Sequence, residues 1–191
     1  MNGNWIQTYT GRQVFFDAQP NQYHIVDIAH GLSNACRFAG QCNQFYSVAQ
    51  HSVLVSQRVP EEFALWGLMH DAPEAYTGDI VHPYKIQFFE LQRVEAIMMR
   101  SIGDVFGLSS PRPDIIGEVD VRMWATEWKE LMLPSVGKMG KKYQNVEPYP
   151  EKIVPVSSIK AEQLFLDRWL SLIDKKHPQH KDVENRLLSI R

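Results

Sequence analysis

A histidine and an aspartate stand side by side at the end of a strongly apolar run. His70 and Asp71 follow residues 65–69. A second histidine, His51, and a second aspartate, Asp120, lie on other segments of the chain. Two imidazoles and two carboxylates from three separate segments form a ligand set that suits a divalent metal ion. On the adjacent pair alone, a structural core histidine followed by a solvated turn residue is the simpler interpretation.

The segment that begins at His70 favours a metal site. Neighbouring residues on a regular helix point about 100° apart, so a His-Asp pair can reach one ion only where the helix ends or bends. Pro73 removes a backbone donor and disfavours helical geometry at the residue before it, which predicts such an end. The segment also carries three carboxylates, Asp71, Glu74 and Asp79. Charged side chains are seldom buried unless they are paired or bound to metal, so we expect a cation or a polar cleft here.

The spacing of these residues resembles that of a known family. His51, His70-Asp71 and Asp120 match the H…HD…D pattern of the HD-domain metal-dependent phosphohydrolases. The resemblance is closest to the small 5′-deoxynucleotidase branch and the related phage dATP triphosphohydrolases, and it covers roughly residues 25 to 132. The further matching residues are Arg37-Phe38, fourteen residues before His51, then Gln50-His51-Ser52, Glu74 and Thr77-Gly78-Asp79.

The resemblance implies a set of four metal ligands, His51, His70, Asp71 and Asp120. Neutral imidazoles with carboxylates suit Zn, Mn, Co, Fe or Ni better than calcium, and the sequence does not choose among these metals. Branches of the superfamily with two metals add several histidines after the HD pair. Here only His82 follows before the C-terminal region. We therefore expect one divalent transition metal per chain.

The resemblance also implies roles for the residues around the metal. Glu74 stands where the family has the carboxylate that positions or deprotonates the attacking water, and Asp79 where a second acid helps to protonate the leaving oxygen. Arg37 matches a phosphate-binding arginine, whose planar fork fits phosphoryl oxygens. Phe38 departs from the pattern, because the deoxynucleotidases carry a tryptophan there that shields the sugar. Lys85, six residues after Asp79, could reach a phosphate or remain a solvated helix lysine.

The function that this resemblance implies is metal-dependent hydrolysis of a (deoxy)nucleotide, with water attacking the 5′ α-phosphorus. The preferred interpretation is a 5′-deoxynucleotidase that converts a deoxynucleoside monophosphate into a deoxynucleoside and phosphate. One alternative is a dNTP triphosphohydrolase, with Lys138, Lys141 and Lys142 as contacts for the additional phosphates or as solvated loop residues. Another is a non-catalytic nucleotide sensor. The matches at Glu74 and Asp79 disfavour a sensor, which has no need of proton-transfer groups.

Composition limits the class of protein. The chain has 191 residues, 44% hydrophobic and 22% charged, which fits one globular domain over residues 1–191. A net charge of −2 and a pI near 6.4 argue against a broad DNA- or RNA-binding surface but are compatible with a small nucleotide. No segment resembles a membrane span or a secretory signal, so we expect a cytoplasmic protein, with Cys36 and Cys42 as reduced thiols. Related small HD enzymes form homo-oligomers, and we expect the same here.

Apolar periodicity predicts an all-α helical bundle, and the resemblance implies that this bundle is of the HD-domain type. A small β-hairpin extension is expected within residues 1–20. Helices are predicted from Val26, from Ser47, from Pro60, from Pro83 through Met99 with Phe88 on its inward face, and across Asp120. Residues 134–156 should form a long loop. Ser157 or Ser158 should cap the last helix, and residues 177–191 should form a polar C-terminal tail.

Overall fold

Helices build most of the computed structural model, which describes residues 5–16, 22–135, 143 and 145–191. The helices are α1 (Ile25–Asn34), α2 (Val48–Ser56), α3 (Ala64–Met69), α4 (Glu74–Thr77), α5 (His82–Lys85), α6 (Phe89–Phe106), α7 (Asp114–Leu131), α8 (Ser158–Leu172) and α9 (His180–Ile190), with the 3₁₀ turns η1 (Arg37–Gly40) and η2 (Glu61–Phe63). Strands β1 (Trp5–Gln7) and β2 (Gln13–Phe15) pair antiparallel. The predicted helical fold with a small N-terminal hairpin is therefore confirmed.

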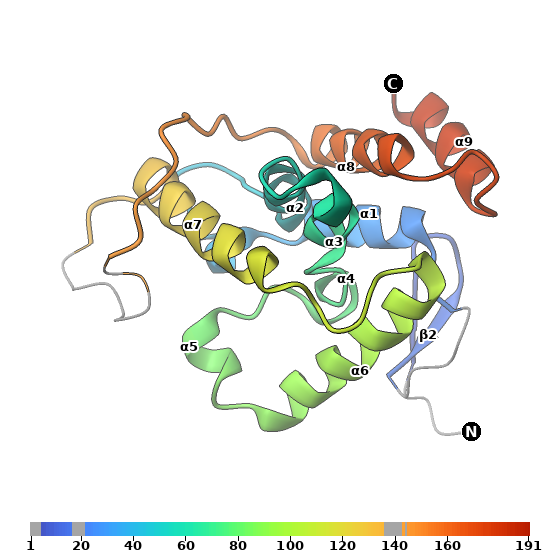
Figure 1. Cartoon of the computed structure of the whole chain (residues 1–191), viewed down its shortest axis with the longest axis horizontal. Helices are drawn as coiled ribbons and strands as arrows, with labels where there is room; N and C mark the ends of the chain where they lie inside the picture. Colours follow the sequence, from blue (N-terminus) through green and yellow to red (C-terminus); the bar gives the residue numbers. More distant parts are fainter. Residues whose placement is uncertain (1–4, 17–21, 136–142, 144) are drawn as a thin grey trace.

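The hydrophobic core lies where α1, α2, α3 and α8 meet. Figure 1 shows α8 lying along α1 and α2, with α3 beneath them and α7 on the left-hand side of the molecule. Ile28 and Leu32 of α1 and Phe165 and Trp169 of α8 are fully buried in one cluster. Apolar burial of this extent stabilises the helices together, because short helices are marginal in isolation. The same packing fixes α2 and α3, which carry His51 and His70.

Capping serines fix where two of these helices begin. The side chain of Ser47 accepts a hydrogen bond from the backbone nitrogen of Gln50 at 3.2 Å, so α2 begins where the sequence predicts. The side chain of Ser157 accepts from the backbone nitrogen of Lys160 at 3.3 Å. The cap of α8 is thus Ser157 and not Ser158.

The predicted helix after Pro83 differs from the observed one. A short α5 ends at Lys85, and α6 begins only at Phe89 and continues past Met99 to Phe106. Figure 1 shows α5 and the first turns of α6 standing away from the central helices. The prediction that Phe88 faces inward is wrong, since its side chain is 56% exposed. Periodicity marks an apolar face, but it does not say whether another element covers that face.

The C-terminal region also differs from its prediction. The expected polar tail over residues 177–191 is wrong, because α9 occupies most of it and buries Val183 and Leu187. Gln179 accepts a hydrogen bond from the backbone nitrogen of Ile25 at 2.7 Å, which ties the start of α9 to the start of α1. Two buried apolar residues one turn apart are enough to dock a short helix whose remaining surface is polar.

The long loop is only partly described. Residue 143 forms a single 3₁₀ position, and residues 145–156 contain no helix or strand. Lys138, Lys141 and Lys142 lie outside the described residues, so their predicted contacts with additional phosphates stay predictions. Among the helices in the described ranges, none is long and apolar enough to cross a membrane.

Gly31 allows α4 to lie close against α1, and its replacement should destabilise the protein. A Cβ atom at Gly31 would lie 2.6 Å from the backbone oxygen of Ala75 and 2.9 Å from its Cβ. Overpacking of this kind costs about 1–3 kcal/mol, so Gly31→Ala should lower the free energy of unfolding by that amount in urea denaturation. Because Ala75 follows Glu74, the same change should displace the carboxylate predicted to act in catalysis.

Gly117→Ala is the matched control. A Cβ atom at Gly117, in the first turn of α7, would meet its nearest neighbour, Nη2 of Arg112, at 3.6 Å, an ordinary contact. Alanine is preferred over glycine in a helix by roughly 0.5–1 kcal/mol, so this variant should be neutral or more stable. Equal stability of Gly31→Ala and Gly117→Ala would contradict the close packing of α1 on α4.

Candidate active site

Three helices bring two histidines and an aspartate together in the interior. His51 lies on α2, His70 follows α3 directly, and Asp120 lies on α7; one ligand atom from each falls within 4.8 Å of the others. The two Nε2 atoms are 3.3 Å apart. Oδ1 of Asp120 lies 3.2 Å from Nε2 of His51 and 3.8 Å from Nε2 of His70. The described residues contain no other group of this kind close enough to hold one ion.

Asp71 borders the same point from the turn between α3 and α4. Its Oδ2 lies 3.2 Å from Nε2 of His70 and 3.7 Å from Nε2 of His51. The backbone bends here through tight turns, because Ala72 donates to the oxygen of Met69 and Glu74 to the oxygen of Asp71, both at 2.9 Å. The predicted bend after His70 is present, and it lets two adjacent side chains face one position.

The hydrogen bonds of the two imidazoles leave both Nε2 atoms as lone-pair donors. Nδ1 of His70 lies 2.8 Å from the backbone oxygen of Gly67, which can only accept. Nδ1 of His51 lies 2.5 Å from Oε1 of Glu127. With both Nδ1 atoms donating, the two Nε2 lone pairs face each other and need a proton or a cation between them. A hydrogen bond at the ring nitrogen that does not face the metal is usual for histidines that bind metal.

The electrostatics of the cluster also favour a cation. Burial lowers the pKa of His70, but the charge of Asp71 and the hydrogen bonds of Asp120 and Asp71 outweigh it and raise that pKa well above its usual value. Burial raises the pKa of Asp120, but its hydrogen bonds with His51 and His70 and their charges together have a larger, opposite effect and hold that pKa well below its usual value. A buried site that attracts protons this strongly is suited to a divalent ion as well. The residues present therefore fit the predicted metal.

A cavity of about 700 Å³ opens above the cluster. Every predicted site residue except the two histidines lines it: Arg37, Phe38, Asp71, Glu74, Asp79, Lys85 and Asp120. Its volume lies in the range of small-molecule sites, roughly 300–1,000 Å³. Most of the remaining lining residues are apolar, with Ile80, Val81, Pro83 and Ile86 among the aliphatic residues and Trp124, Trp128 and Tyr143 among the aromatic ones. The cavity thus combines charged and apolar lining residues.

Glu74 presents one carboxylate oxygen without a partner. Its Oε1 accepts from Nζ of Lys85 at 2.9 Å, whereas Oε2 is buried and makes no hydrogen bond within the part of the chain that the structure describes. Burial, followed by the charges of Asp71 and Asp79, raises the pKa of Glu74 well above its usual value. A carboxylate with a raised pKa and a free lone pair is suited to proton transfer.

Lys85 and Asp79 line the same cavity as Glu74. Lys85 is held by two carboxylates, since its Nζ is also 3.1 Å from Oε1 of Glu95. Lys85 therefore lines the cavity but is paired with protein groups. Asp79 follows Gly78, whose positive φ of 79° turns the chain toward the cavity. Burial is the main cause that raises the pKa of Asp79.

Arg37 and Phe38 enter the site through a strained turn. Arg37 is buried, and its Nη2 donates to Oε2 of Glu127 at 3.0 Å. Phe38 and Ala39 have positive φ values of 54° and 52°, a conformation that costs non-glycine residues about 1–3 kcal/mol each and clusters at functional sites. The Phe38 ring centroid lies 6.1 Å from that of Trp124 and 6.0 Å from that of Trp128.

Helix α7 supplies functional candidates that the sequence interpretation missed. Trp124 and Trp128 line the cavity, and Glu127 is fully buried beside His51. Burial raises the pKa of Glu127, but the charges of His51 and Arg37 lower it more, so this carboxylate is ionised. The signal for these residues is their spacing of four, seven and eight residues from Asp120, which places them on one side of the helix.

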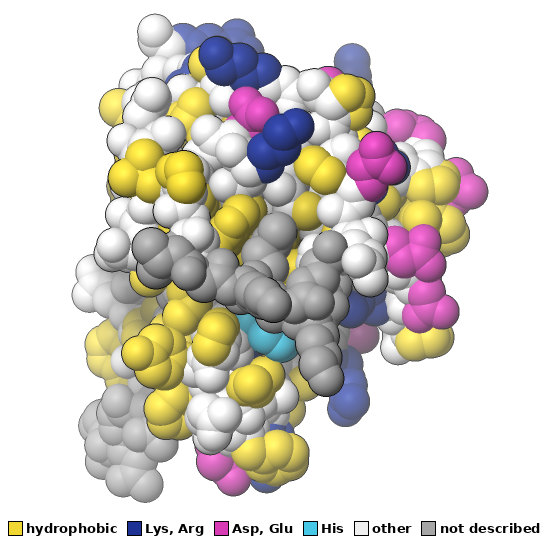
Figure 2. All heavy atoms as spheres, turned by 90° about the vertical axis from the view of Figure 1, so that its left-hand side faces the viewer, with side chains coloured by type: hydrophobic (Ala, Val, Ile, Leu, Met, Phe, Trp, Pro, Cys, Tyr) yellow, Lys and Arg dark blue, Asp and Glu magenta, His cyan; other side chains and the backbone are white. Residues whose placement is uncertain are grey.

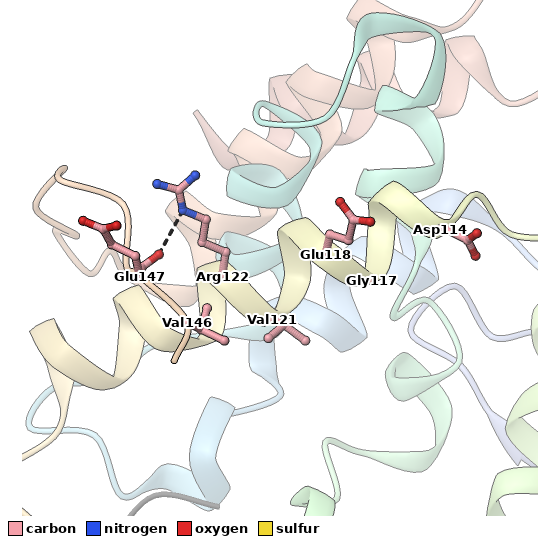
Figure 3. Close-up of a pocket in the computed structure, with 7 residues that line it drawn as sticks. All are labelled: Asp114, Gly117, Glu118, Val121, Arg122, Val146 and Glu147. Carbon is pink, nitrogen blue, oxygen red and sulfur yellow. Dashed lines mark hydrogen bonds between the residues drawn. The ribbon is translucent and has the colours of Figure 1, made fainter. Parts of the chain in front are cut away.

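A second hollow lies along the outside of α7. Figure 3 shows its lining residues, with Nε of Arg122 donating to the backbone oxygen of Glu147 at 3.0 Å. Its volume of about 880 Å³ exceeds that of the cavity above the metal cluster. None of the predicted site residues lines it, and it is widely open to solvent. Size alone therefore does not identify the active site.

Hydrophobic residues are exposed near the cavity. Figure 2 shows hydrophobic side chains gathering on the lower part of the face that lies at the left of Figure 1. The exposed large apolar side chains of the α5–α6 region are Tyr84, Ile86, Phe88 and Phe89. An exposed apolar run is typical of interaction surfaces. The expected homo-oligomer stays a prediction.

The fold and the cluster together define a mostly helical protein with a buried histidine and aspartate group that could bind a metal ion. A comparison with models of known protein families finds no match. The chain is 38% identical over 175 residues to the Escherichia coli K12 protein YfdR, covering 88% of this chain and 96% of that protein. The chain therefore belongs to the YfdR family.

A second relative matches a shorter stretch. An uncharacterized protein of Rhodobacter capsulatus is 38% identical over 95 residues, which is 44% of this chain and 48% of that protein. Neither relative has a name that states an activity. The function must therefore be inferred from the residues of the site.

Proposed function

We propose that the chain is an HD-type metal-dependent phosphohydrolase that cleaves the 5′-phosphoester of a (deoxy)nucleotide, with a deoxynucleoside monophosphate as the favoured substrate. The observation that carries this proposal is the convergence of three kinds of group on one cavity. Asp71 and Asp120 of the metal cluster line it, and so does Arg37. Glu74 also lines it, and its buried Oε2 has no hydrogen-bond partner among the described residues. A binding module without catalysis would need the cluster and the arginine but not a proton-transfer carboxylate.

The residues that would hold the metal are His51, His70, Asp71 and Asp120. When bound, a divalent ion supplies a Lewis acid that draws electron density from a phosphoryl oxygen and favours ionisation of water. The chain contributes two imidazoles in the correct tautomer and two carboxylates whose pKa values are lowered.

Arg37 would bind the phosphate beside the metal ligands. Its Nη2 is held by Glu127, and its Nη1 lies 3.9 Å from Oδ2 of Asp71, at the wall of the cavity. A buried guanidinium makes strong, directional hydrogen bonds to phosphoryl oxygens, because water does not compete for its donors. The arginine would thus orient the phosphorus toward Glu74.

Glu74 and Asp79 would move the two protons of the reaction. As the water oxygen bonds to phosphorus, Glu74 accepts a proton from that water. The bond between phosphorus and O5′ breaks, its electron pair leaves on O5′, and Asp79 donates the proton that completes the nucleoside hydroxyl. Glu74 is buried and Asp79 is partly buried, and burial is the largest cause that raises the pKa of each, so the pair suits this division, with one group ionised and one protonated.

The apolar lining residues of the cavity support a nucleoside as the rest of the substrate. Phe38, Trp124 and Trp128 form an aromatic wall, and Ile80 and Val81 lie among the aliphatic residues of the lining. A flat base or a sugar can pack on such surfaces while its phosphate contacts the charged lining residues. Packing of this kind supports a nucleotide over a small, fully charged phosphoester.

Arg37→Lys should weaken substrate binding. Lysine keeps the charge and can still pair with Glu127, but it loses the planar fork. A charge-assisted hydrogen bond contributes about 1.5–3 kcal/mol, so KM should rise roughly tenfold or more. Arg93→Lys is the control, because the side chain of Arg93 is 64% exposed and its ion-pair partner within the described part of the chain is Glu90. If steady-state kinetics show an unchanged KM in Arg37→Lys, Arg37 does not bind the phosphate.

The proposed reaction is tested by turnover on a panel of nucleoside mono- and triphosphates, in ribo and deoxy forms, with Mn²⁺, Co²⁺ or Zn²⁺ added. Separation of the products decides between the alternatives. Release of inorganic phosphate from a deoxynucleoside monophosphate supports the favoured reaction. Release of intact triphosphate would assign the chain as a triphosphohydrolase. Tight nucleotide binding without any product would favour the sensor.

A further inference from the structure

Glu127 is a buried carboxylate that does not line the main cavity. It lies on α7, seven residues after Asp120, and its side chain is 0% exposed. Its Oε1 lies 2.5 Å from Nδ1 of His51 and accepts from the hydroxyl of Tyr46 at 2.8 Å. Its Oε2 accepts from Nη2 of Arg37 at 3.0 Å. One carboxylate thus contacts donors from three different parts of the chain.

The contact with His51 fixes how that imidazole faces the cluster. A carboxylate oxygen only accepts, so Nδ1 carries the proton and Nε2 presents its lone pair. If the ring flipped or changed tautomer, the buried charge of Glu127 would lose this hydrogen-bond donor. An uncompensated buried charge is strongly unfavourable. The orientation of the metal-facing nitrogen of His51 therefore depends on Glu127.

The contact with Arg37 fixes the other half of the site. The guanidinium is planar and rigid, so anchoring Nη2 sets the plane of the whole group and the direction of Nη1. Nε of Arg37 is buried and has no hydrogen-bond partner within the described ranges. Among the described residues, Glu127 accepts a hydrogen bond from this guanidinium at 3.0 Å, whereas Oδ2 of Asp71 lies 3.9 Å from Nη1.

We propose that Glu127 is a positioning residue that holds His51 and Arg37 at a fixed separation, so that the metal and the phosphate of the substrate lie in register. This inference rests on the proposed phosphohydrolase function. It gives Glu127 no contact with substrate. The competing explanation is that Glu127 is only a structural ion pair that stabilises the core.

Glu127→Gln tests the proposal through metal affinity, measured without substrate. Glutamine keeps the shape of glutamate but lacks its charge and cannot offer two acceptor oxygens to these donors. Loss of an outer hydrogen-bond partner of a metal ligand typically costs about 10–100-fold in metal affinity. The Kd for Co²⁺ or Zn²⁺, measured by competition with a chelator, should rise by that factor. The affinity of the metal-loaded protein for inorganic phosphate should fall as well.

Tyr46→Phe is the matched control. It removes one neutral donor to Oε1 and leaves the contacts of Glu127 with His51 and Arg37 in place. The metal and phosphate affinities of Tyr46→Phe should equal those of the wild type, even if its melting temperature falls. A purely structural Glu127 would give the opposite result, in which Glu127→Gln melts earlier but binds Co²⁺ and inorganic phosphate like the wild type. That result would overturn the proposal.

A second variant keeps the test decisive if Glu127→Gln does not fold. Glu127→Asp retains the charge that balances Arg37, but it is one methylene shorter and cannot reach all three donors. Weakened Co²⁺ binding in this folded variant supports the proposal, and wild-type affinity overturns it. If the proposed metal-dependent phosphohydrolase function is itself wrong, the result is different, because the wild-type protein would then bind no metal.

Discussion

Replacing His70 or Asp71 with alanine is expected to strip the protein of its metal and to abolish turnover. Wild-type protein should carry about one transition metal per chain, since four donors converge on one point. Each variant removes a donor whose nearest atom lies within 3.7 Å of Nε2 of His51. A metal that stabilises transition-state charge supplies several kcal/mol, so turnover should fall by at least about 10³-fold. Elemental analysis and steady-state rates measure the two effects separately.

Asp114→Ala is the control for metal content. Asp114 is an exposed acid on the same helix as Asp120 and lines the outer hollow, so its removal should leave the metal in place. Full metal occupancy in both His70→Ala and Asp71→Ala would rule out the site. Loss of metal in Asp114→Ala as well would indicate nonspecific binding to surface acids.

The second large effect is expected at Glu74, where binding and chemistry should separate. Glu74→Gln keeps an oxygen that can accept from Lys85 but cannot take up a proton. The variant should retain metal and nucleotide binding and lose roughly 10²-fold or more in turnover, the usual contribution of a proton-transfer group. Burial, and then the charges of Asp71 and Asp79, raise the pKa of Glu74, so the wild-type rate should fall as pH drops through that raised pKa. The turnover rate of Glu74→Gln should not show this fall at low pH.

Glu95→Gln is the matched control for Glu74→Gln. Glu95 pairs with the same lysine, with its Oε1 3.1 Å from Nζ of Lys85, but it does not line the main cavity. Its replacement should leave the turnover rate and its pH profile close to those of the wild type. A Glu74→Gln enzyme with near-normal turnover would assign Glu74 to structure.

Much of the candidate site could be predicted because its chemistry is encoded in residue types at short spacing. The turn after His70 is visible in the sequence, since Pro73 limits the helix and acids follow an apolar run. His51 and Asp120 carry no such local signal, and only the overall pattern of the resemblance associates them with His70. The structure brings these segments together, although the metal and the catalytic roles remain proposals.

Glu127 shows what local patterns do not contain. Its spacing of seven residues from Asp120 places it on the same side of α7, but a glutamate within an amphipathic helix is most often solvated, and this spacing does not predict its burial. Its burial follows from Arg37, Tyr46 and His51, which are 76 to 90 residues away. Long-range pairing of this kind depends on the packed fold and is not readable from spacing on one helix.

The errors in the fold have a similar origin. The start of α6 is amphipathic, but the sequence does not say that no element covers Phe88 or Phe89. The region after His177 is polar, but two apolar residues, Val183 and Leu187, suffice to dock α9 on the core. Helix capping is more local, and for this reason the start of α2 at Ser47 is predicted correctly.

The most direct test of the central proposal is hydrolysis of a deoxynucleoside monophosphate in water labelled with ¹⁸O, with the divalent metal present or removed by chelation. Attack of water on phosphorus predicts label in the released phosphate, none in the nucleoside, and no reaction after the metal is removed. Label in the nucleoside would mean that another bond is cleaved. Undiminished turnover in metal-free protein would contradict the role of the His51, His70, Asp71 and Asp120 cluster.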